Sequence, residues 1–507
     1  MALEQRVLSF AQPLAMSRNG RGSPPFTPQQ LQLDLLLQVR VSGAHRGRAA
    51  PAPFRSFTKR LGLLTCACAM NLPKSLFAVL TRGKAVSLFL LLAAGVHAEN
   101  WPQFRGPQGI GVSPEKNLPL HWNRTNHVRW KTPLPDRGNA TPAVWENRIF
   151  VNQAIEKEGR RELFCFDRAT GKKLWSAGVT YLKKEPTHEI NPYCSASPAT
   201  DGERVLASFG SAGLYCYDFD GKEVWHRDLG EQIHIWGNGA SPIIYRDLAI
   251  LNVGPGERTF LIALNKRTGE TVWQINEPGG ASGIDLPGKP KSDWIGSWST
   301  PIITDINDRP ELIFSFPKRV VGLDPRTGKE LWSCSGLNPL VYTSPLFADG
   351  VVVAMGGYGG AAVAFKPSGA GDLTKKNTLW LTPKNKQRIG SGVISDGHIY
   401  VLDQPGVAEC IELKTGKVVW EERLASPSNR FTSWSSAVLT GDKLVYAINE
   451  AGETFVLKAS PAFKMEAVNA LDERTLSSLA VSHGEIFIRT YKNLWCISSA
   501  TPEVTSR

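Results

Sequence analysis

The chain has 507 residues, of which 42% are hydrophobic, and a formal net charge of +12. Residues 1–98 hold 12 of the 58 basic and only 2 of the 46 acidic side chains, so the rest of the chain, with 46 basic and 44 acidic groups, is nearly neutral. A nearly neutral main part excludes the basic surface on which nucleic-acid and anionic-membrane binding depend. We therefore expect no nucleic-acid partner.

The amino-terminal 98 residues fall into two segments. Residues 1–69 are rich in Arg, Pro, Ser and Gln without sustained periodicity, which indicates an over-extended gene start or a disordered extension. Residues 70–98 combine basic residues, an apolar run over 85–96 and small residues at Val96 and Ala98, as in a secretory signal peptide. The run is shorter than the roughly 20 residues of a membrane span. We expect an exported, periplasmic protein without a transmembrane segment; a signal anchor behind a cytoplasmic tail is the alternative.

One pattern then recurs to the carboxyl terminus: alternating apolar residues, an Asp or similar residue, a Thr-Gly-Lys type turn and a Trp. The copies are FCFDRATGKKLW (164–175), YCYDFDGKEVW (215–225), IALNKRTGETVW (262–273), VGLDPRTGKELW (321–332), a stretched VAFKPSGAGDLTKKNTLW (363–380) and ECIELKTGKVVW (409–420). Each copy predicts a strand, a tight turn whose glycine takes a positive φ, and a second, outer strand that begins near the Trp.

A second series marks an innermost strand in each unit. Small or polar residues, often Ser/Thr-Pro, lead into an apolar strand that starts near 139, 195, 239, 298, 342, 390, 435 and 477. Eight such units predict one all-β domain over residues 99–500, an eight-bladed β-propeller of four-stranded antiparallel blades, followed by a tail over 501–507.

The ends of the repeat array complement each other. The last unit, which ends at Ala500, lacks an outer strand, whereas Trp130 lies in an outer strand that no unit precedes. We expect this N-terminal strand to complete the last blade, which removes a sheet edge. The seventh unit has Phe463 and Met465 in place of its Trp, so we expect a weaker blade contact there. The rings expected to dock neighbouring blades are Trp130, Trp175, Trp225, Trp273, Trp332, Trp380 and Trp420.

The cysteines predict neither disulfides nor a metal site. Cys165, Cys216, Cys410 and Cys496 occupy the same strand position of separate units. Facing sheets lie about 10 Å apart, too far for a disulfide, so we expect buried free thiols. Cysteine and histidine spacings typical of metal ligands are absent after residue 98. The run Asp305, Asn307, Asp308 is half of a calcium loop without its Gly and Glu, and predicts a hairpin tip.

The loops that enter the innermost strands should surround one end of the propeller's central axis, where a ligand would bind. Aromatic rings beside Arg, His and Asn side chains could stack on a planar ligand or hold a partner's side chains. Alternatively, Trp298 and Trp434 fill the centre and Arg388 caps backbone carbonyls. No carboxylate pair or Ser/His/Asp set predicts catalytic residues. The candidate binding residues are Arg137, His188, Tyr193, His234, Trp236, Asn238, Trp298, Tyr342, Arg388 and Trp434.

The D-x-x-T-G-K-x-x-W pattern resembles the tryptophan-docking motif of the PQQ-like repeat superfamily, which includes quinoprotein alcohol dehydrogenases and the outer-membrane assembly factor BamB. The resemblance covers residues 121–500. The segment WPQFRGPQGIGV (101–112) is also similar to the lead-in of exported bacterial propellers of this kind. The resemblance implies the propeller fold.

The sequence departs from these two kinds of relative at two points that bear on its activity. Quinoprotein dehydrogenases typically carry adjacent cysteines over the quinone, and this sequence has no adjacent cysteines. BamB proteins carry a lipid-anchoring Cys at the mature start, where this chain has Glu99. We expect a BamB-like, non-enzymatic and monomeric module without cofactor that binds a protein partner or small ligand at one face. The alternative is an alcohol dehydrogenase that depends on PQQ and calcium, with the cofactor at the channel mouth. A third hypothesis, a carbohydrate-binding or hydrolytic propeller, would need clustered carboxylates at the mouth, where the sequence offers only a few, such as Glu189 and Asp293.

Overall fold

The computed structural model describes residues 99–281, 294–384 and 386–499. The segments predicted over 1–69, 70–98 and 501–507 lie outside the described residues. Within the described ranges, no helix has the length and apolar character that a membrane crossing requires.

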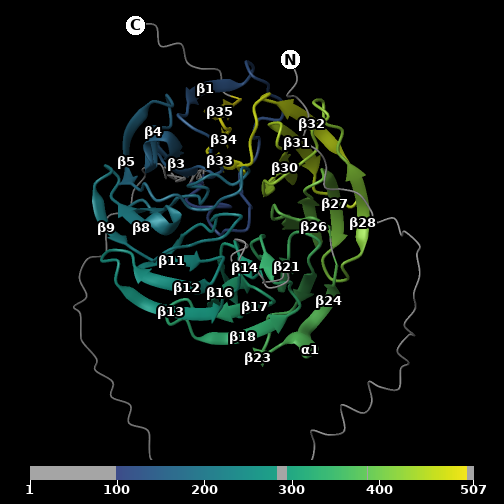
Figure 1. Cartoon of the computed structure of the whole chain (residues 1–507). Helices are drawn as coiled ribbons and strands as arrows, with labels where there is room; N and C mark the ends of the chain where they lie inside the picture. The colour runs from purple at the N-terminus through teal and green to yellow at the C-terminus, as the bar shows by residue number, and fades with distance from the viewer. Residues whose placement is uncertain (1–98, 282–293, 385, 500–507) are drawn as a thin grey trace, which may run out of the picture. The chain divides into compact units, whose positions relative to one another are not determined.

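The described chain forms eight antiparallel sheets, the blades, arranged around a common centre (Figure 1). Blade 1 contains β2 (Ala143–Trp145), β3 (Arg148–Ile155), β4 (Arg160–Asp167) and β5 (Lys173–Thr180). Blade 2 contains β6 (Ala199–Thr200), β7 (Val205–Ser208), β8 (Leu214–Tyr217) and β9 (Glu223–Arg227). Blade 3 contains β10 (Ile243–Tyr245), β11 (Leu248–Val253), β12 (Arg258–Asn265) and β13 (Thr271–Pro278). Blade 4 contains β15 (Ile302–Ile306), β16 (Arg309–Phe316), β17 (Arg319–Leu323) and β18 (Glu330–Ser335), with β23 (Gly371–Asp372) added in parallel.

The second half repeats this plan. Blade 5 contains β20 (Leu346–Ala348), β21 (Val351–Met355), β22 (Ala362–Phe365) and β24 (Thr378–Thr382). Blade 6 contains β25 (Val393–Ser395), β26 (His398–Leu402), β27 (Val407–Glu412) and β28 (Val418–Arg423). Blade 7 contains β29 (Val438–Leu439), β30 (Leu444–Ile448), β31 (Glu453–Lys458) and β32 (Met465–Ala470). Blade 8 contains β33 (Ala480–Ser482), β34 (Glu485–Arg489), β35 (Asn493–Ser498) and β1 (Val128–Pro133).

A few short elements lie between these strands, some of them within a blade. They are the 3₁₀ turns η1 (Glu156–Glu158) and η2 (Gly210–Ala212), the one-turn helix α1 (Thr374–Asn377), and the parallel pair β14 (Gly296–Ser297) and β19 (Leu340–Val341). The predicted all-β, eight-bladed fold is therefore confirmed. Blade 8 combines the two ends of the described chain, because β1 pairs antiparallel with β35 and sets Trp130 opposite Cys496.

The hydrophobic core lies between neighbouring blades. The two middle strands of each blade are almost fully buried, whereas outer strands such as β5 alternate between half-buried and exposed positions. Between blades 2 and 3, for example, Leu206 and Cys216 pack with Ala249 and Ile262. The six cysteines of the described residues are all buried and free, which was predicted for four of them: Cys165, Cys216, Cys410 and Cys496. They act there as small apolar side chains.

Five of the repeated tryptophans dock onto the next blade in one way. The Trp225 indole N–H donates to the carbonyl of Lys266, 2.8 Å away, and the ring covers Gly269. A Cβ added to Gly269 would lie 2.8 Å from that ring, and this glycine has a φ of +75°, so space and backbone conformation both require glycine. The same arrangement recurs for Trp130 over Gly171, Trp175 over Gly221, Trp273 over Gly328 and Trp380 over Gly416.

Two of the expected docking rings differ. Trp332 is fully buried and donates to the carboxylate of Glu311 in its own blade, 2.6 Å away. The stretched repeat that follows offers it no Thr-Gly-Lys turn, because α1 and β23 occupy that region. Trp420 donates to the carbonyl of Ser460 and meets the edge of Phe463, so the aromatic residue of the seventh unit replaces the missing glycine contact.

Candidate functional site

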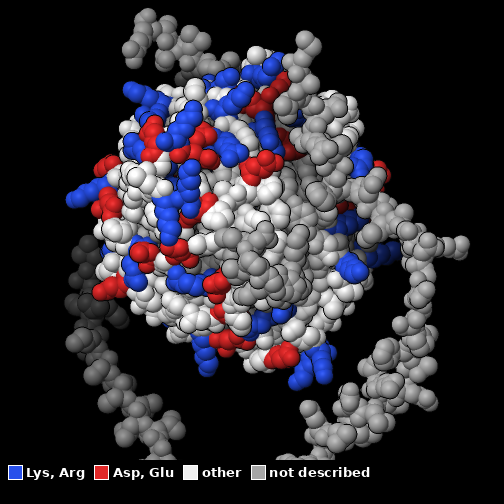
Figure 2. All heavy atoms as spheres, viewed as in Figure 1, with Lys and Arg blue, Asp and Glu red and all other residues white. Residues whose placement is uncertain are grey.

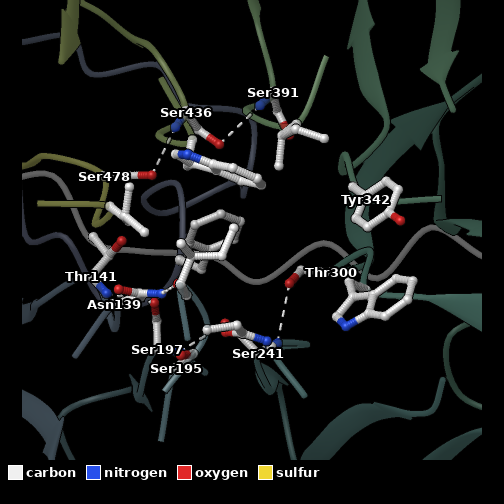
Figure 3. Close-up of a pocket in the computed structure, with 18 of the residues that line it drawn as sticks. Asn139, Thr141, Ser195, Ser197, Ser241, Thr300, Tyr342, Ser391, Ser436 and Ser478 are labelled. Carbon is white, nitrogen blue, oxygen red and sulfur yellow. Dashed lines mark hydrogen bonds between the residues drawn. The ribbon is translucent and has the colours of Figure 1, made fainter. Parts of the chain in front are cut away.

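A ring of hydroxyl side chains surrounds the centre of the propeller where the chain enters each innermost strand. In seven successive hydrogen bonds of 2.9–3.3 Å, the backbone N–H of one member donates to the hydroxyl oxygen of the member in the next blade. Figure 3 draws part of this series, including the bonds that join Ser391, Ser436 and Ser478. The members of this hydroxyl ring are Thr141, Ser197, Ser241, Thr300, Ser344, Ser391, Ser436 and Ser478. Because each blade contributes one member, the ring fixes the spacing of the blades at the centre.

The residue two positions before each ring member varies from blade to blade. These residues are Asn139, Ser195, Gly239, Trp298, Tyr342, Ile389, Trp434 and Leu476. All of them line a cavity of about 180 Å³, and seven hydroxyl-ring members line it as well. The remaining lining residues are Phe104, His188, Ile190, Asn191, Trp236 and Tyr358. The cavity therefore combines a repeated polar layer with a layer that is specific to this sequence.

Aromatic rings form much of the cavity wall. Trp298 and Tyr342 stack with centroids 4.8 Å apart and ring planes 9° apart. Tyr358 meets both Tyr342 and Trp434 edge to face. His188 and Trp236 pack at 4.7 Å in another part of the cavity. Since Tyr358 is 40% exposed, the aromatic wall reaches the surface at this end, which we call the open end.

The described cavity lining contains no Asp, Glu, Lys or Arg. In the view of Figure 2, acidic and basic side chains are interspersed elsewhere on the described surface. Burial raises the pKa of Tyr358 to about 12 and raises that of Tyr342 further, so both phenols keep their protons at neutral pH. The cavity can thus offer stacking surfaces and uncharged hydrogen-bonding groups.

The segment 101–113 closes the opposite end of the cavity, which we call the sealed end. Trp101 exchanges backbone hydrogen bonds with Val144 in blade 1, and Gly111 accepts one from Leu439 in blade 7. Between them, Phe104 lines the cavity and Arg105 lies almost fully buried. The segment therefore spans the ring of inner strands.

Arg105 anchors this segment through backbone carbonyls, and no carboxylate of the described residues pairs with it. Its guanidinium donates to the carbonyls of Ser391 and Gly392 at 3.0 and 2.6 Å, and to those of Gly109 and Ile110 at 3.2 and 2.6 Å. Burial lowers its pKa to about 9, so it stays charged at neutral pH. One cation thus joins the segment to the entry of blade 6.

Five of the ten predicted binding residues line this cavity: His188, Trp236, Trp298, Tyr342 and Trp434. Tyr193 and Asn238 line a smaller adjoining cavity instead. Arg137 lies outside both cavities and donates to the carbonyl of Glu189.

The other two predicted residues are buried behind the wall. Arg388 is 3% exposed and donates to Glu409, 2.6 Å away, so its expected place at the mouth needs correction. A cation so far from water needs that buried carboxylate. His234 is fully buried and packs edge to face behind Trp298, and burial lowers its pKa to about 4.

The sequence carried signals for residues that we did not predict. The hydroxyl ring appears in the sequence as a Ser or Thr at the same place in all eight inner-strand motifs. Tyr358 lies in MGGYGGAA, which connects β21 and β22 as a hairpin, so only the blade geometry shows that its tip faces the cavity. Phe104 lies in the lead-in segment, whose path the pattern could not reveal.

The lining does not suit a calcium-bound PQQ. That quinone is an anionic tricarboxylate, and calcium prefers carboxylate oxygens, yet the described lining offers neither cations nor carboxylates. Among the residues that the structure describes, no group of three or more His, Cys, Asp or Glu side chains could hold a metal ion.

Comparison with known proteins identifies the family to which the sequence belongs. The family model described as outer membrane protein assembly factor BamB matches residues 112–184, 159–422 and 391–505. The chain belongs to this family. The predicted relationship to PQQ-like repeat propellers is thereby confirmed.

Relatives of the family differ in what they do. BamB from Yersinia pestis is 20% identical over 318 residues, which are 58% of this chain and 72% of that protein. The quinoprotein alcohol dehydrogenase PedH from Pseudomonas putida is 28% identical over 218 residues, 37% of this chain and only 35% of that protein. The relatives therefore include an assembly factor and an enzyme.

Solved structures of both kinds share the fold. BamB from Moraxella catarrhalis has a TM-score of 0.52 and 14% identity, with coverage of 75% of this chain and 99% of that one. A europium-containing methanol dehydrogenase has a TM-score of 0.58 and 12% identity, with coverage of 78% and 90%. At such identities the likeness concerns the fold alone, so function has to be argued from the site.

Proposed function

We propose that this protein is an exported, periplasmic binding module without enzymatic activity, which receives a partner or ligand at the open end of the cavity. The observation that carries the proposal is the cavity itself, with aromatic walls, uncharged polar groups and a sealed opposite end. Aromatic side chains beside neutral donors and acceptors are typical of binding sites. The family's BamB members support a role in binding or assembly.

The second candidate is an alcohol dehydrogenase that depends on PQQ and calcium. PedH and the methanol dehydrogenase fold favour it. The absence of charged groups from the described lining argues against it, because an anionic quinone and a divalent cation would be held without compensating charges. We therefore rank the binding module first.

The experiment places a photo-crosslinking amino acid at Tyr358 of the full-length protein in cells of the source type. We expect irradiation to attach a cell-envelope component at this position. The matched control carries the same amino acid at Val224, an exposed position on the outer strand β9. Equal capture at both positions would contradict a site at the open end.

A parallel assay adds PQQ and calcium to the purified protein and follows dye-coupled alcohol oxidation. We expect no dye reduction above a protein-free control. Turnover that depends on both additions would replace the binding module with the dehydrogenase.

A further inference from the structure

The cavity holds hydrogen-bonding groups whose capacity is not used within the described protein. Asn139 donates through Nδ2 to the carbonyl of Ile190 at 2.8 Å, but its buried Oδ1 accepts no hydrogen bond. A buried acceptor without a partner is unfavourable, so the site favours a ligand that supplies a donor.

The hydroxyl ring offers hydrogen-bond donors, which complement the free acceptor of Asn139. The oxygens of Ser197, Ser241 and Ser436 each accept a backbone N–H, and none of these hydroxyls donates to a described protein atom. A hydroxyl has one hydrogen to donate, which leaves the cavity-lining members able to bond an acceptor in the ligand. Figure 3 shows these labelled residues around the cavity, with Tyr342 on its wall.

The walls add flat apolar surfaces beside these polar groups. Trp434 is half-buried, and its indole N–H donates to no described protein atom, so the ring offers both a face and a donor. The stacked pair of Trp298 and Tyr342 forms a second surface. A ligand that fits has apolar faces and a rim of groups that both donate and accept.

Three other ligand classes match less well. Anions such as phosphates and carboxylates would enter without a cation in the described lining to offset their charge. An apolar peptide side chain would leave the hydroxyl ring and Asn139 without partners. A quaternary ammonium suits a cage of ring faces alone, whereas here Trp298 and Tyr342 stack on each other and hydroxyl groups share the wall.

Resting on the proposed function, we infer that the ligand is an uncharged carbohydrate. One neutral sugar ring enters the cavity, places a C–H face on an aromatic wall, and exchanges hydrogen bonds with Asn139 and the hydroxyl ring. The volume suits a single ring, and the sealed end forces the rest of an oligosaccharide to leave through the open end. The ligand class thus follows from the mixture of rings and neutral polar groups.

The test titrates the full-length protein with cellohexaose, maltohexaose, xylohexaose and chitohexaose in a calorimeter. We expect at least one to bind with one-to-one stoichiometry. Trp434→Ala should weaken binding at least 10-fold, and Asn139→Ala several-fold. Trp420→Phe is the matched control, because Trp420 is a half-buried tryptophan on the outer rim, and it should leave affinity unchanged.

Choline and an apolar pentapeptide serve as competing probes. Binding of either one that is lost in Trp434→Ala, with no binding of the four glycans, would overturn the carbohydrate and leave the binding module standing. Glycan binding that survives Trp434→Ala and Asn139→Ala would also overturn the inference, because the sugar would then lie elsewhere. PQQ-dependent turnover would instead overturn the proposed function.

Discussion

The two ends of the central cavity use the same eightfold framework in opposite ways. At the sealed end, the segment 101–113 is fixed by backbone pairing and by the buried guanidinium of Arg105, which donates to four backbone carbonyls. At the open end, Trp434 and Tyr358 are partly exposed and make edge-to-face contacts with little hydrogen bonding. The sealed end therefore contributes mainly to stability, whereas the open end has aromatic and hydrogen-bonding groups that a ligand can use. In a repeat fold, the departures from symmetry therefore mark where to look for function.

The largest expected effect on stability comes from removing Arg105, which anchors the sealed end. Arg105→Ala should lower the free energy of unfolding by about 3–5 kcal/mol, because four carbonyls lose a charged donor in a buried place. Chemical denaturation would measure the change. Arg124→Ala, at an exposed ion pair with Asp472, should change stability by less than about 1 kcal/mol. Equal effects of the two variants would refute the anchoring role.

The next prediction concerns His234, which is buried behind the cavity wall, and the pH dependence of the protein's stability. His234 has a pKa of about 4 in the folded protein, below its ordinary 6.5, because burial disfavours its charged form. Its contribution to stability is complete above pH 6.5 and is lost as the pH falls toward 4, because only the unfolded chain takes up the proton in that window. Relative to His234→Asn, the wild type should lose about 3 kcal/mol between pH 7 and pH 4.

The measurement compares the wild type with His234→Asn, because other buried groups also change the stability with pH. Burial raises the pKa of Asp403 to about 6, so this group stabilises the fold as the pH falls and opposes the trend of His234. Asp403 is present in both proteins, so its effect cancels in the comparison. Parallel curves for wild type and variant would show that His234 is not held neutral.

A smaller effect is expected at Phe104, which lines the cavity at the sealed end. Phe104→Ala should cost about 2 kcal/mol, since this half-buried ring packs at the sealed end of the cavity. It should also enlarge the cavity, which xenon binding under pressure would reveal. Phe104→Leu is the matched control and should keep both stability and cavity volume close to those of the wild type.

The smallest stability effect is expected at the open end. Tyr358→Ala should change the free energy of unfolding by about 1 kcal/mol or less, because the ring is 40% exposed and contributes only edge contacts. Thermal or chemical denaturation would check this. A loss as large as that of Arg105→Ala would remove the contrast between the two ends.

The sequence by itself determined the architecture. In five repeats a glycine such as Gly269 stands four residues before a tryptophan such as Trp273, and together with the eight inner-strand motifs this local chemistry suffices to specify eight blades. It also indicated which loops meet at one end, where Trp298, Tyr342 and Trp434 line one cavity.

Only the tertiary structure decided which charged and polar groups reach the cavity. The Arg388 side chain lies in the interior and not at the mouth, because it donates a hydrogen bond to the buried carboxylate of Glu409. The Trp332 ring lies within its own blade, because the next blade lacks a docking turn. The path of Phe104 and Arg105 across the ring depends on carbonyls contributed by blade 6, nearly 300 residues away along the chain. Such choices rest on long-range partners and desolvation, which no local spacing encodes.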